Sequence, residues 1–490
     1  MTVEEGSSHG GKLVAGMGRL WLSLFVQAGV FLASPAYPTA RPSDADLEFA
    51  ESYLGKFYND RLQASHQMAG LASHEFMAKP KGTQHLFELV ESGELDQLTP
   101  AATRRGRCGL SDAEQFGETI RWRNRTLTYR ISNYTPKMRP SQIRRVIREA
   151  WRLWAQVAPL TFRRRKRRGA DIEISFNNKD HKDGAPFDGK GGTLAHAFLP
   201  GPGIGGDVHF DAEEDWTNNA TGCNLFATAV HEFGHALGLA HSSDPGAVMF
   251  PAYNFVPHGD VLLSFQDVKD IQELYGKSSI KLDRPPPKTP DKCDHDLSFD
   301  AVTELQQEVI FFKDRFMWRT HPDFEEIGIT LITSLWTDIP SYMDAAYENT
   351  ASNTIVFFKG SLYWKVKVLE VEDGYPRNIS DFGFPARIKS IDAALHFRET
   401  HLTEFFTGEE CWRYDEEQRR MMDGYPKMIT DEWPGVPSPI DASVAYEGLI
   451  YFFLGNQQLE FDPSLRRITS KTPANAWLKC RGGTNMISLD

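Results

Sequence analysis

Near the middle of the chain, the stretch HEFGHALGLAH has the residue types and the spacing of a catalytic metal site. On a helix, His231 and His235 lie one turn apart on one face, and Glu232 overlooks the same spot. Gly238 can adopt the backbone angles that end a helix, which allows the chain to turn back and bring in His241. The spacing therefore predicts three imidazole ligands and an open fourth position, as in a catalytic zinc site.

The chemistry expected of this site is peptide hydrolysis. A zinc ion lowers the pKa of a water to about 7 and polarises a peptide carbonyl. Glu232 can take the proton of that water as general base, so no covalent intermediate is needed. Met249 follows His241 by eight residues, and this motif followed by a methionine turn is typical of metzincins. The alternative, two core histidines on an ordinary helix, does not explain Gly238, His241 or Met249.

Composition and the first residues indicate an exported protein with several domains. A chain of 490 residues with 41% hydrophobic residues can form more than one core. The net charge of -12 argues against nucleic acid or an anionic membrane as partner. The stretch GRLWLSLFVQAGVFLASPA, which ends at Ala36, is typical of an export signal; a start at Met17 and a buried N-terminal helix are the alternatives. Its apolar run is too short to span a membrane, so we expect a secreted protein without a membrane anchor.

Export changes how the five cysteines are interpreted, because disulfides persist outside the cell. Cys293 and Cys480 bracket the last large block of the chain, which favours one ring-closing bridge. Cys108, Cys223 and Cys411 remain as an odd set. At least one of these thiols is therefore free or has another role.

With Ser242 directly after the third histidine, the sequence resembles the matrix metalloproteinases, the matrixin branch of the metzincins. The resemblance implies that Cys108, in GRCGLSD, is a propeptide cysteine that binds the catalytic zinc in a latent form. Gly106 and Ser111 stand where the family has prolines, so the backbone is less restrained and the latch is expected to be weaker. The alternative for Cys108 is an unpaired structural cysteine.

The same resemblance implies three further metal sites. A structural zinc would be bound by three imidazoles and a carboxylate, those of His181, Asp183, His196 and His209. One calcium would be bound by carboxylate and carbonyl oxygens of Asp188, Gly189, Gly191, Thr193, Asp211 and Glu214. A second would be bound by those of Asp171, Gly203, Gly205 and Asp207. We therefore expect two zinc ions and two or more calcium ions, with Ala227 lining a roomy S1′ pocket.

Local patterns predict the elements that must position these residues. Residues 127–131 and 171–176 alternate as half-buried strands do. Between them, apolar residues at helical spacing follow Ser141, which we expect to be the N-cap. The stretch TLAHA, residues 193–197, is expected to be the edge strand to which an extended substrate adds.

The last part of the chain repeats with a period of about 45 to 50 residues, as propeller blades do. The stretches DAVTE, DAAYE, DAALH and DASVA each precede an aromatic strand. Four such blades, closed by Cys293 and Cys480, resemble a hemopexin-like propeller. The domains expected are a signal (1–36), a helical propeptide (37–115), an α+β zincin-like catalytic domain (116–276), a proline-rich linker (277–292), the all-β propeller (293–480) and a tail (481–490).

The run RRRKRR, residues 163–168, resembles a protease processing site and a nuclear signal. Cutting there would separate the first strand and helix from the zinc helix. We interpret the run as a solvated basic loop, with a heparin or matrix contact as the alternative.

The function expected is that of a secreted zinc endopeptidase made as a latent zymogen. Extracellular matrix proteins would be its substrates, and protein inhibitors and activating proteases its partners. The alternative is a catalytically silent, propeller-based binding protein.

Overall fold

The computed structural model describes residues 107–109, 120–218, 222–252, 261–305, 308–321, 327–367 and 369–480. The expected signal (1–36), all of the propeptide except residues 107–109, and the tail (481–490) lie outside these ranges. Gly106 and Ser111 also lie outside them. Within the described ranges, no helix has the length and apolar character needed to cross a membrane.

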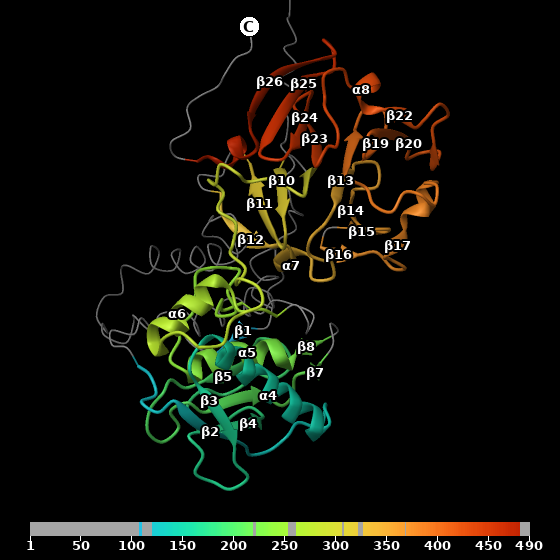
Figure 1. Ribbon diagram of the computed structural model, residues 1–490. Helices are drawn as coiled ribbons and strands as arrows, with labels where there is room; N and C mark the ends of the chain where they lie inside the picture. Colours follow the sequence, from blue (N-terminus) through green and yellow to red (C-terminus); the bar gives the residue numbers. More distant parts are fainter. Residues whose placement is uncertain are drawn as a thin grey trace, which may run out of the picture. The chain divides into compact units, whose positions relative to one another are not determined.

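Six strands of the first half form one sheet (Figure 1). They are β1 (Arg107–Cys108), β2 (Thr126–Ile131), β3 (Thr161–Arg164), β4 (Ile172–Asn177), β5 (Thr193–Ala197) and β6 (Val208–Asp211). Their order is β1-β5-β6-β4-β2-β3, and all neighbours are parallel except β5 and β6. The strands predicted from sequence are confirmed as β2, β4 and β5. A short pair, β7 (Trp216–Thr217) and β8 (Cys223–Asn224), precedes the helix that carries His231 and His235.

Three helices pack with this sheet around one core: α4 (Pro140–Val157), α5 (Leu225–Ala236) and α6 (Phe265–Tyr275). Trp151 of α4 is stacked on Phe162 of β3 at a centroid distance of 4.3 Å and on Phe233 of α5 at 3.7 Å. The Trp154 indole donates a hydrogen bond of 2.9 Å to the carbonyl of Val230. These aromatic contacts hold α5 against α4, so both tryptophans serve core packing.

The predicted N-cap of α4 is wrong. The helix begins at Pro140, and the cap residue is Arg139 instead of Ser141. Proline is favoured in the first turn because its fixed φ suits the helix and its missing N–H would have no partner there. The Gln142 side chain accepts a hydrogen bond of 3.1 Å from the Arg139 backbone N–H, which leaves no capping role for Ser141.

The second half contains four antiparallel sheets, each headed by one of the predicted repeats (Figure 1). The first comprises β9 (Ala301–Leu305), β10 (Glu308–Lys313), β11 (Phe316–Thr320) and β12 (Ile329–Leu331), followed by α7 (Ile332–Leu335). The second comprises β13 (Ala345–Asn349), β14 (Thr354–Lys359), β15 (Leu362–Lys367), β16 (Glu370–Val371) and β17 (Arg377–Asn378), followed by η2 (Ile379–Phe382). The third comprises β18 (Ala393–Phe397), β19 (Leu402–Thr407), β20 (Glu410–Asp415), β21 (Arg420–Met421) and β22 (Lys427–Met428), followed by α8 (Ile429–Glu432). The fourth comprises β23 (Ala442–Tyr446), β24 (Leu449–Leu454), β25 (Gln457–Asp462) and β26 (Arg467–Pro473), followed by η3 (Ala474–Leu478).

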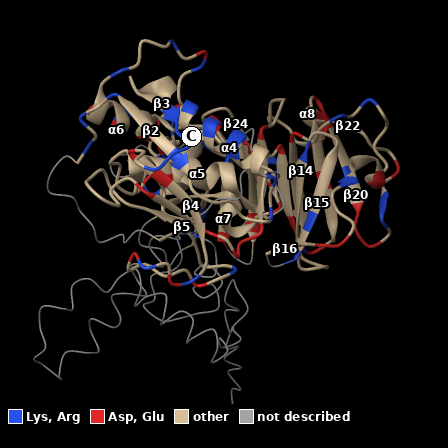
Figure 2. Ribbon diagram, turned by 90° about the horizontal axis from the view of Figure 1, so that it is seen from below, with Lys and Arg blue, Asp and Glu red and all other residues tan. Residues whose placement is uncertain are grey.

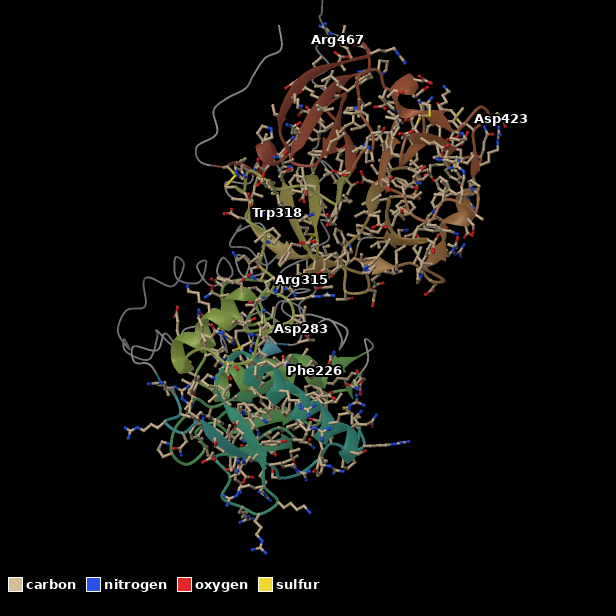
Figure 3. All side chains as sticks on the ribbon, viewed as in Figure 1. Phe226, Asp283, Arg315, Trp318, Asp423 and Arg467 are labelled. Carbon is tan, nitrogen blue, oxygen red and sulfur yellow. A yellow bond between two sulfur atoms is a disulfide. The ribbon has the colours of Figure 1, made fainter. Side chains whose placement is uncertain are left out.

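The four sheets close into a ring, which confirms the four-bladed propeller. The first strands β9, β13, β18 and β23 contact one another in a cycle. Trp318 of the first blade, labelled in Figure 3, shares a core with Phe453 of the last. A disulfide joins Cys293 to Cys480 across 187 residues, with a Cα–Cα distance of 5.5 Å. The predicted bridge therefore joins the two ends of the propeller, and Cys108, Cys223 and Cys411 are not disulfide-bonded.

We expect the bridge to stabilise the propeller. In the chain-entropy model, closing a loop of this length contributes at most about 5 kcal/mol, because it restricts the unfolded chain. The double substitution Cys293→Ser and Cys480→Ser should lower the unfolding temperature in calorimetry, whereas Cys223→Ser, which can keep its hydrogen bond to Glu214, should change it little.

Mass spectrometry tests the pairing itself. Alkylation of the denatured, unreduced chain should modify three cysteines, since three are not disulfide-bonded. Recovery of Cys223 or Cys411 in a disulfide-linked peptide would contradict the assignment.

Candidate active site

Helix α5 carries two of the predicted ligands, His231 and His235, on one face. The Asn224 side chain caps it by accepting hydrogen bonds from the N–H groups of Phe226 and Ala227, at 2.9 and 3.3 Å. Both histidines of the helix are buried, and the Nε2 atoms of His231 and His235 are 3.1 Å apart. The predicted one-turn spacing is therefore realised, with both rings turned to one point.

The end of α5 brings in the third histidine. Gly238 has a φ of 104°, which a side chain would oppose, and an added Cβ would lie 2.1 Å from the carbonyl oxygen of Ile120. The Gly238 N–H donates to the carbonyl of His235 at 2.8 Å, and the Leu239 N–H to that of Gly234 at 2.9 Å. This is a Schellman turn, which reverses the chain within three residues. The ring of His241 consequently lies 4.8 Å from that of His235.

Backbone carbonyls orient two of the three rings. Nδ1 of His231 lies 2.6 Å from the carbonyl oxygen of Val248, and Nδ1 of His235 lies 2.7 Å from that of Leu239. A carbonyl can only accept, so each Nδ1 carries the proton and each Nε2 keeps its lone pair. Burial holds the pKa of His235 well below its usual value. The His235 imidazole is therefore neutral at pH 7 and ready to bind a metal.

Cys108 completes a four-membered cluster with these rings. One ligand atom from each of Cys108, His231, His235 and His241 lies within 4.8 Å of the others. Three imidazole nitrogens and a sulfur are the ligands that zinc prefers, so the residues fit this ion. Cys108 is 5% exposed and belongs to β1, which pairs with β5 through Arg107 opposite Thr193 and Cys108 opposite Ala195. The sheet thus fixes the thiol at the fourth position.

Glu232 lies next to this cluster and is fully buried. Burial raises the pKa of its carboxyl group to about 8, and the Cys108 thiol acts in the opposite direction. A divalent cation nearby would favour the ionised form of the carboxyl group. The position and chemistry of Glu232 are those of a group that can receive a proton at the metal site.

Met249, the methionine of the predicted turn, packs against α5 at Gly234. An added Cβ on Gly234 would meet the Met249 sulfur at 2.2 Å, so only glycine allows this close approach. The segment that carries Met249 also supplies the Val248 carbonyl that orients His231. The methionine turn therefore supports the ligand face of α5 from below.

Sequence reasoning missed the residue that holds this turn. Asp267 of α6 is 1% exposed and accepts hydrogen bonds from the N–H groups of Val248 at 2.8 Å, Ser264 at 2.7 Å and Met249 at 3.1 Å. It belongs to a capping box with Ser264, whose hydroxyl accepts from the Asp267 N–H. The spacing S-x-x-D before an apolar helix was the available signal.

The predicted structural zinc site forms a second compact cluster. The ligand atoms of His181, Asp183, His196 and His209 all lie within 4.8 Å of one another. One oxygen of Asp183 lies 2.6 Å from His181 Nε2, 2.8 Å from His196 Nε2 and 2.7 Å from His209 Nδ1. Burial lowers the pKa of His196 to about 4. Burial alone would raise the pKa of Asp183, but hydrogen bonds from the Ala185 N–H and from two imidazoles lower it to about 2. Neutral imidazoles and an ionised carboxylate fit zinc.

The residues predicted for calcium are arranged less tightly. In the described part of the chain, the three carboxylates of the first set do not form a group whose ligand atoms all lie within 4.8 Å of one another, and the second set contains only two carboxylates. Burial raises the pKa of both Asp211 and Glu214, and the charge of Asp188 raises both further, so these three acids share one neighbourhood. Each acid accepts a hydrogen bond from a backbone N–H of residues 189–193. The Gly189 N–H donates to Asp211 at 3.2 Å, the Gly191 N–H to Glu214 at 2.6 Å and the Thr193 N–H to Asp188 at 3.0 Å.

In the second set, the two carboxylates bind different backbone groups. Asp171 accepts from the N–H and hydroxyl of Thr128, whereas Asp207 accepts from the Glu173 N–H at 2.8 Å. Burial raises the pKa of Asp207 to about 6. Gly203 is exposed, and the buried Gly205 makes a 3.4 Å turn hydrogen bond to Pro202. These two carboxylates accept hydrogen bonds from separate backbone groups, so the second calcium site stays a prediction.

Ala227 lies on α5 one turn before His231 and is partly buried. It lines a hollow together with Leu194, His231, Glu232 and Val248. Its small side chain leaves space beside His231 and Glu232, and the S1′ assignment of this hollow stays a prediction.

Two family profiles match this chain. A profile of the family described as Matrixin matches residues 121–276, which include every ligand of both histidine clusters except Cys108. A profile described as Hemopexin matches residues 299–341, 343–386 and 391–438, that is, the first three blades.

Similar proteins align with nearly the whole chain. Matrix metalloproteinase-18 of Xenopus laevis is 42% identical over 469 residues, which cover 95% of this chain and 100% of that protein. Interstitial collagenase of Equus caballus is 44% identical over 92% of this chain and 97% of its own length. Neutrophil collagenase of Homo sapiens is 41% identical over 92% and 96%, respectively.

The role of Asp267 can be tested by substitution with asparagine. The amide of the variant would offer an N–H₂ group to backbone N–H groups that now meet a carboxylate oxygen, at a cost of about 2 to 3 kcal/mol. Asp267→Asn should therefore lower the unfolding temperature and weaken zinc binding in a chelator competition, because Val248 orients His231. Asp270→Asn, on the same helix and bonded to the Gln266 side chain, is the matched control. Equal unfolding temperatures and zinc affinities for the two variants would contradict this role.

Proposed function

We propose, from the premise that the chain belongs to the matrixins, the matrix metalloproteinase family of zinc metalloendopeptidases, that it is a secreted enzyme made as a latent zymogen. In this proposal, removal of the segment that contains Cys108 opens the zinc site. The active enzyme then hydrolyses peptide bonds of extracellular matrix proteins.

One observation carries the proposal of latency. The Cys108 sulfur lies within 4.8 Å of the ligand nitrogens of His231, His235 and His241. A thiolate is a strong zinc ligand, and a fourth protein ligand leaves no position for water. In addition, β1 occupies the edge of β5, the place where an extended peptide would add a strand. The segment therefore blocks both the metal and the substrate-binding edge.

The chemistry of the open site follows from its residues. Zinc bound by three imidazoles supplies Lewis-acid chemistry, which polarises a peptide carbonyl and lowers the pKa of a water. Glu232, which is held rigidly on α5 beside His231, accepts the proton of that water at a carboxylate oxygen. It then passes the proton to the amine nitrogen of the departing fragment. Glu232 lies on α5 together with two of the three histidine ligands, His231 and His235, so the spacing of these three residues does not depend on the motion of a loop.

The relatives support the class of substrate. Two of the proteins similar to this chain are named collagenases, so we propose collagens among the matrix proteins that it cleaves. We further propose protein inhibitors of metalloproteinases and activating proteases as partners, the latter cutting near residues 113–116. The proposed secretion depends on the signal at 1–36, which lies outside the described residues.

We propose two zinc ions and at least two calcium ions per chain. The two compact clusters support the zinc ions, one with an exchangeable fourth position and one with four protein ligands. The acids around Asp211 support one calcium, because burial and mutual repulsion raise the pKa of Asp211, and a bound cation would relieve both effects.

Replacement of Glu232 by glutamine tests the proposed base. The three imidazoles remain, so zinc content measured by mass spectrometry should stay near that of wild type. Loss of the base should lower kcat/KM on a fluorogenic peptide by about 10²- to 10⁴-fold after propeptide removal. Glu149→Gln, a surface change on α4, is the matched control and should keep full activity.

Two results would count against the assignment. Activity of the Glu232→Gln variant within tenfold of wild type would exclude Glu232 as the base. A zinc-loaded, correctly processed wild type without any peptidase activity would favour the alternative of a silent binding protein.

Replacement of Cys108 by serine tests latency. A neutral hydroxyl is a poor zinc ligand, so water should regain the fourth position and the uncleaved chain should hydrolyse the peptide. If the missing prolines weaken the latch, the wild-type zymogen should also show a measurable basal rate, and Gly106→Pro with Ser111→Pro should reduce it. The assay compares rates of the intact chains, with their lengths verified by mass spectrometry.

A mercurial reagent that binds thiols provides the control for this experiment. It should activate the wild-type zymogen and leave the Cys108→Ser variant unchanged. A zinc-loaded Cys108→Ser chain that stays latent would show that another group blocks the site.

A further inference from the structure

Six consecutive basic residues, 163–168, are all exposed and form a segment named here the basic loop. Its first two residues belong to β3, where Arg163 pairs with Thr128 and Arg164 with Tyr129 of β2. The Arg165 N–H donates to the Tyr129 carbonyl at 2.8 Å, and the Arg165 guanidinium donates to the Gly169 carbonyl at 2.7 Å. Strand pairing and this turn fix the first three residues of the loop at the surface.

The charges of the basic loop are not neutralised by the protein. In the parts of the chain that the structure describes, none of the six side chains forms an ion pair with an acid. Acids of the neighbouring elements have other partners: Asp171 accepts hydrogen bonds from Thr128, Glu173 pairs with Arg130 at 2.5 Å, and Glu149 pairs with Arg145 at 2.9 Å. A local concentration of positive charge therefore stands on a chain whose net charge is -12.

Helix α4 extends this positive surface. Arg144, Arg148 and Arg152 follow one another at intervals of four residues and so form a row of about 12 Å on one helix face. Trp151 of α4 stacks at 4.3 Å on Phe162, the residue directly before the basic loop, so the helix lies beside the start of the loop. Figure 2 shows Lys and Arg positions gathered beside β3 and α4.

This surface lies away from the catalytic residues. β3 is the last strand at one edge of the sheet, whereas β5 and β1 form the opposite edge. A ligand bound along the basic loop would leave the edge of β5 and the histidines uncovered. Such a ligand would therefore locate the protein without occupying its active site.

We infer that the basic loop and the arginine row of α4 form a binding surface for a sulfated polysaccharide chain. A linear polyanion can contact the loop and the row at once, and each contact releases counterions. Guanidinium groups bind tetrahedral oxyanions such as sulfate in a bidentate manner, and five of the six loop residues are arginine.

Nucleic acid fits this surface less well. Binding of single strands uses exposed aromatic rings on which bases stack, and the only aromatic residue at the loop, Phe162, is stacked on Trp151 in the core. The chain also carries no excess of positive charge beyond this region, since its net charge is negative. The observations therefore favour a flexible sulfated sugar chain over a stacked base polymer.

The experiment measures binding of a heparin oligosaccharide to the full chain at near-physiological salt. Lys166→Ser, Arg167→Ser and Arg168→Ser together should raise the dissociation constant by about tenfold or more, and the affinity should depend less steeply on salt. The matched control removes three exposed charges from the propeller by Lys389→Ser, Arg419→Ser and Lys471→Ser. It should change the dissociation constant less than about twofold. Adding Arg148→Gln to the loop variant should weaken binding further.

Several results would overturn the inference. These are equal losses in the loop variant and the control, equal affinity for desulfated heparin, or tighter binding of a single-stranded DNA with matched charge. Cleavage after Arg168 by a proprotein-processing protease, with no heparin binding by the intact chain, would identify the loop as a processing site instead. The binding assay needs no hydrolysis, so its outcome is independent of the proposed function, and the peptidase activity of the loop variant should equal that of wild type.

Discussion

The catalytic half of the molecule depends on one geometric constraint. Two histidines on adjacent turns of a helix can reach the same metal ion, but a third histidine on the following turn would be too far away. α5 gives two histidines one turn apart, and the third must come from a chain that leaves the helix and returns at once. Gly238 makes the return possible, because its φ of 104° belongs to a region that side chains disfavour. The carbonyls of His235 and Gly234, which the helix end would leave without partners, are bound by the same turn.

Contacts from distant parts of the sequence then hold this turn. The Trp122 indole donates to the carbonyl of Ala236 at 2.8 Å, and the Tyr275 hydroxyl donates to that of Leu237 at 2.7 Å. Asp267 fixes the methionine turn from the other side through three backbone N–H groups. Each of these partners satisfies a buried polar group, so the ligand geometry is part of the stability of the core rather than an addition to its surface.

The sequence predicted the fold and the two histidine clusters because their signals are local or repeated. The spacing of His231, His235 and His241 and the four aromatic repeats are legible without knowledge of tertiary structure. Asp267 was missed because its partners at 248 and 249 lie nearly twenty residues away and its own motif reads only as a helix cap. The N-cap of α4 was misplaced because Pro140 competes with Ser141 for the same turn. The calcium residues remain predictions, since carbonyl ligands leave no trace in side-chain types.

The short strand β1 has a consequence for how a zymogen could be switched. Two ladder residues and one sulfur would bind weakly as a separate peptide, yet in an intact chain they are tethered to their partner at an effective concentration on the order of millimolar. A cut between Gly109 and Ile120 would turn this internal contact into an encounter between two molecules. At the far lower concentrations of a dilute extracellular protein, the released strand would rarely return. Activation would then be effectively one-way because the cleaved segment is diluted, and no conformational rearrangement of the catalytic core would be required.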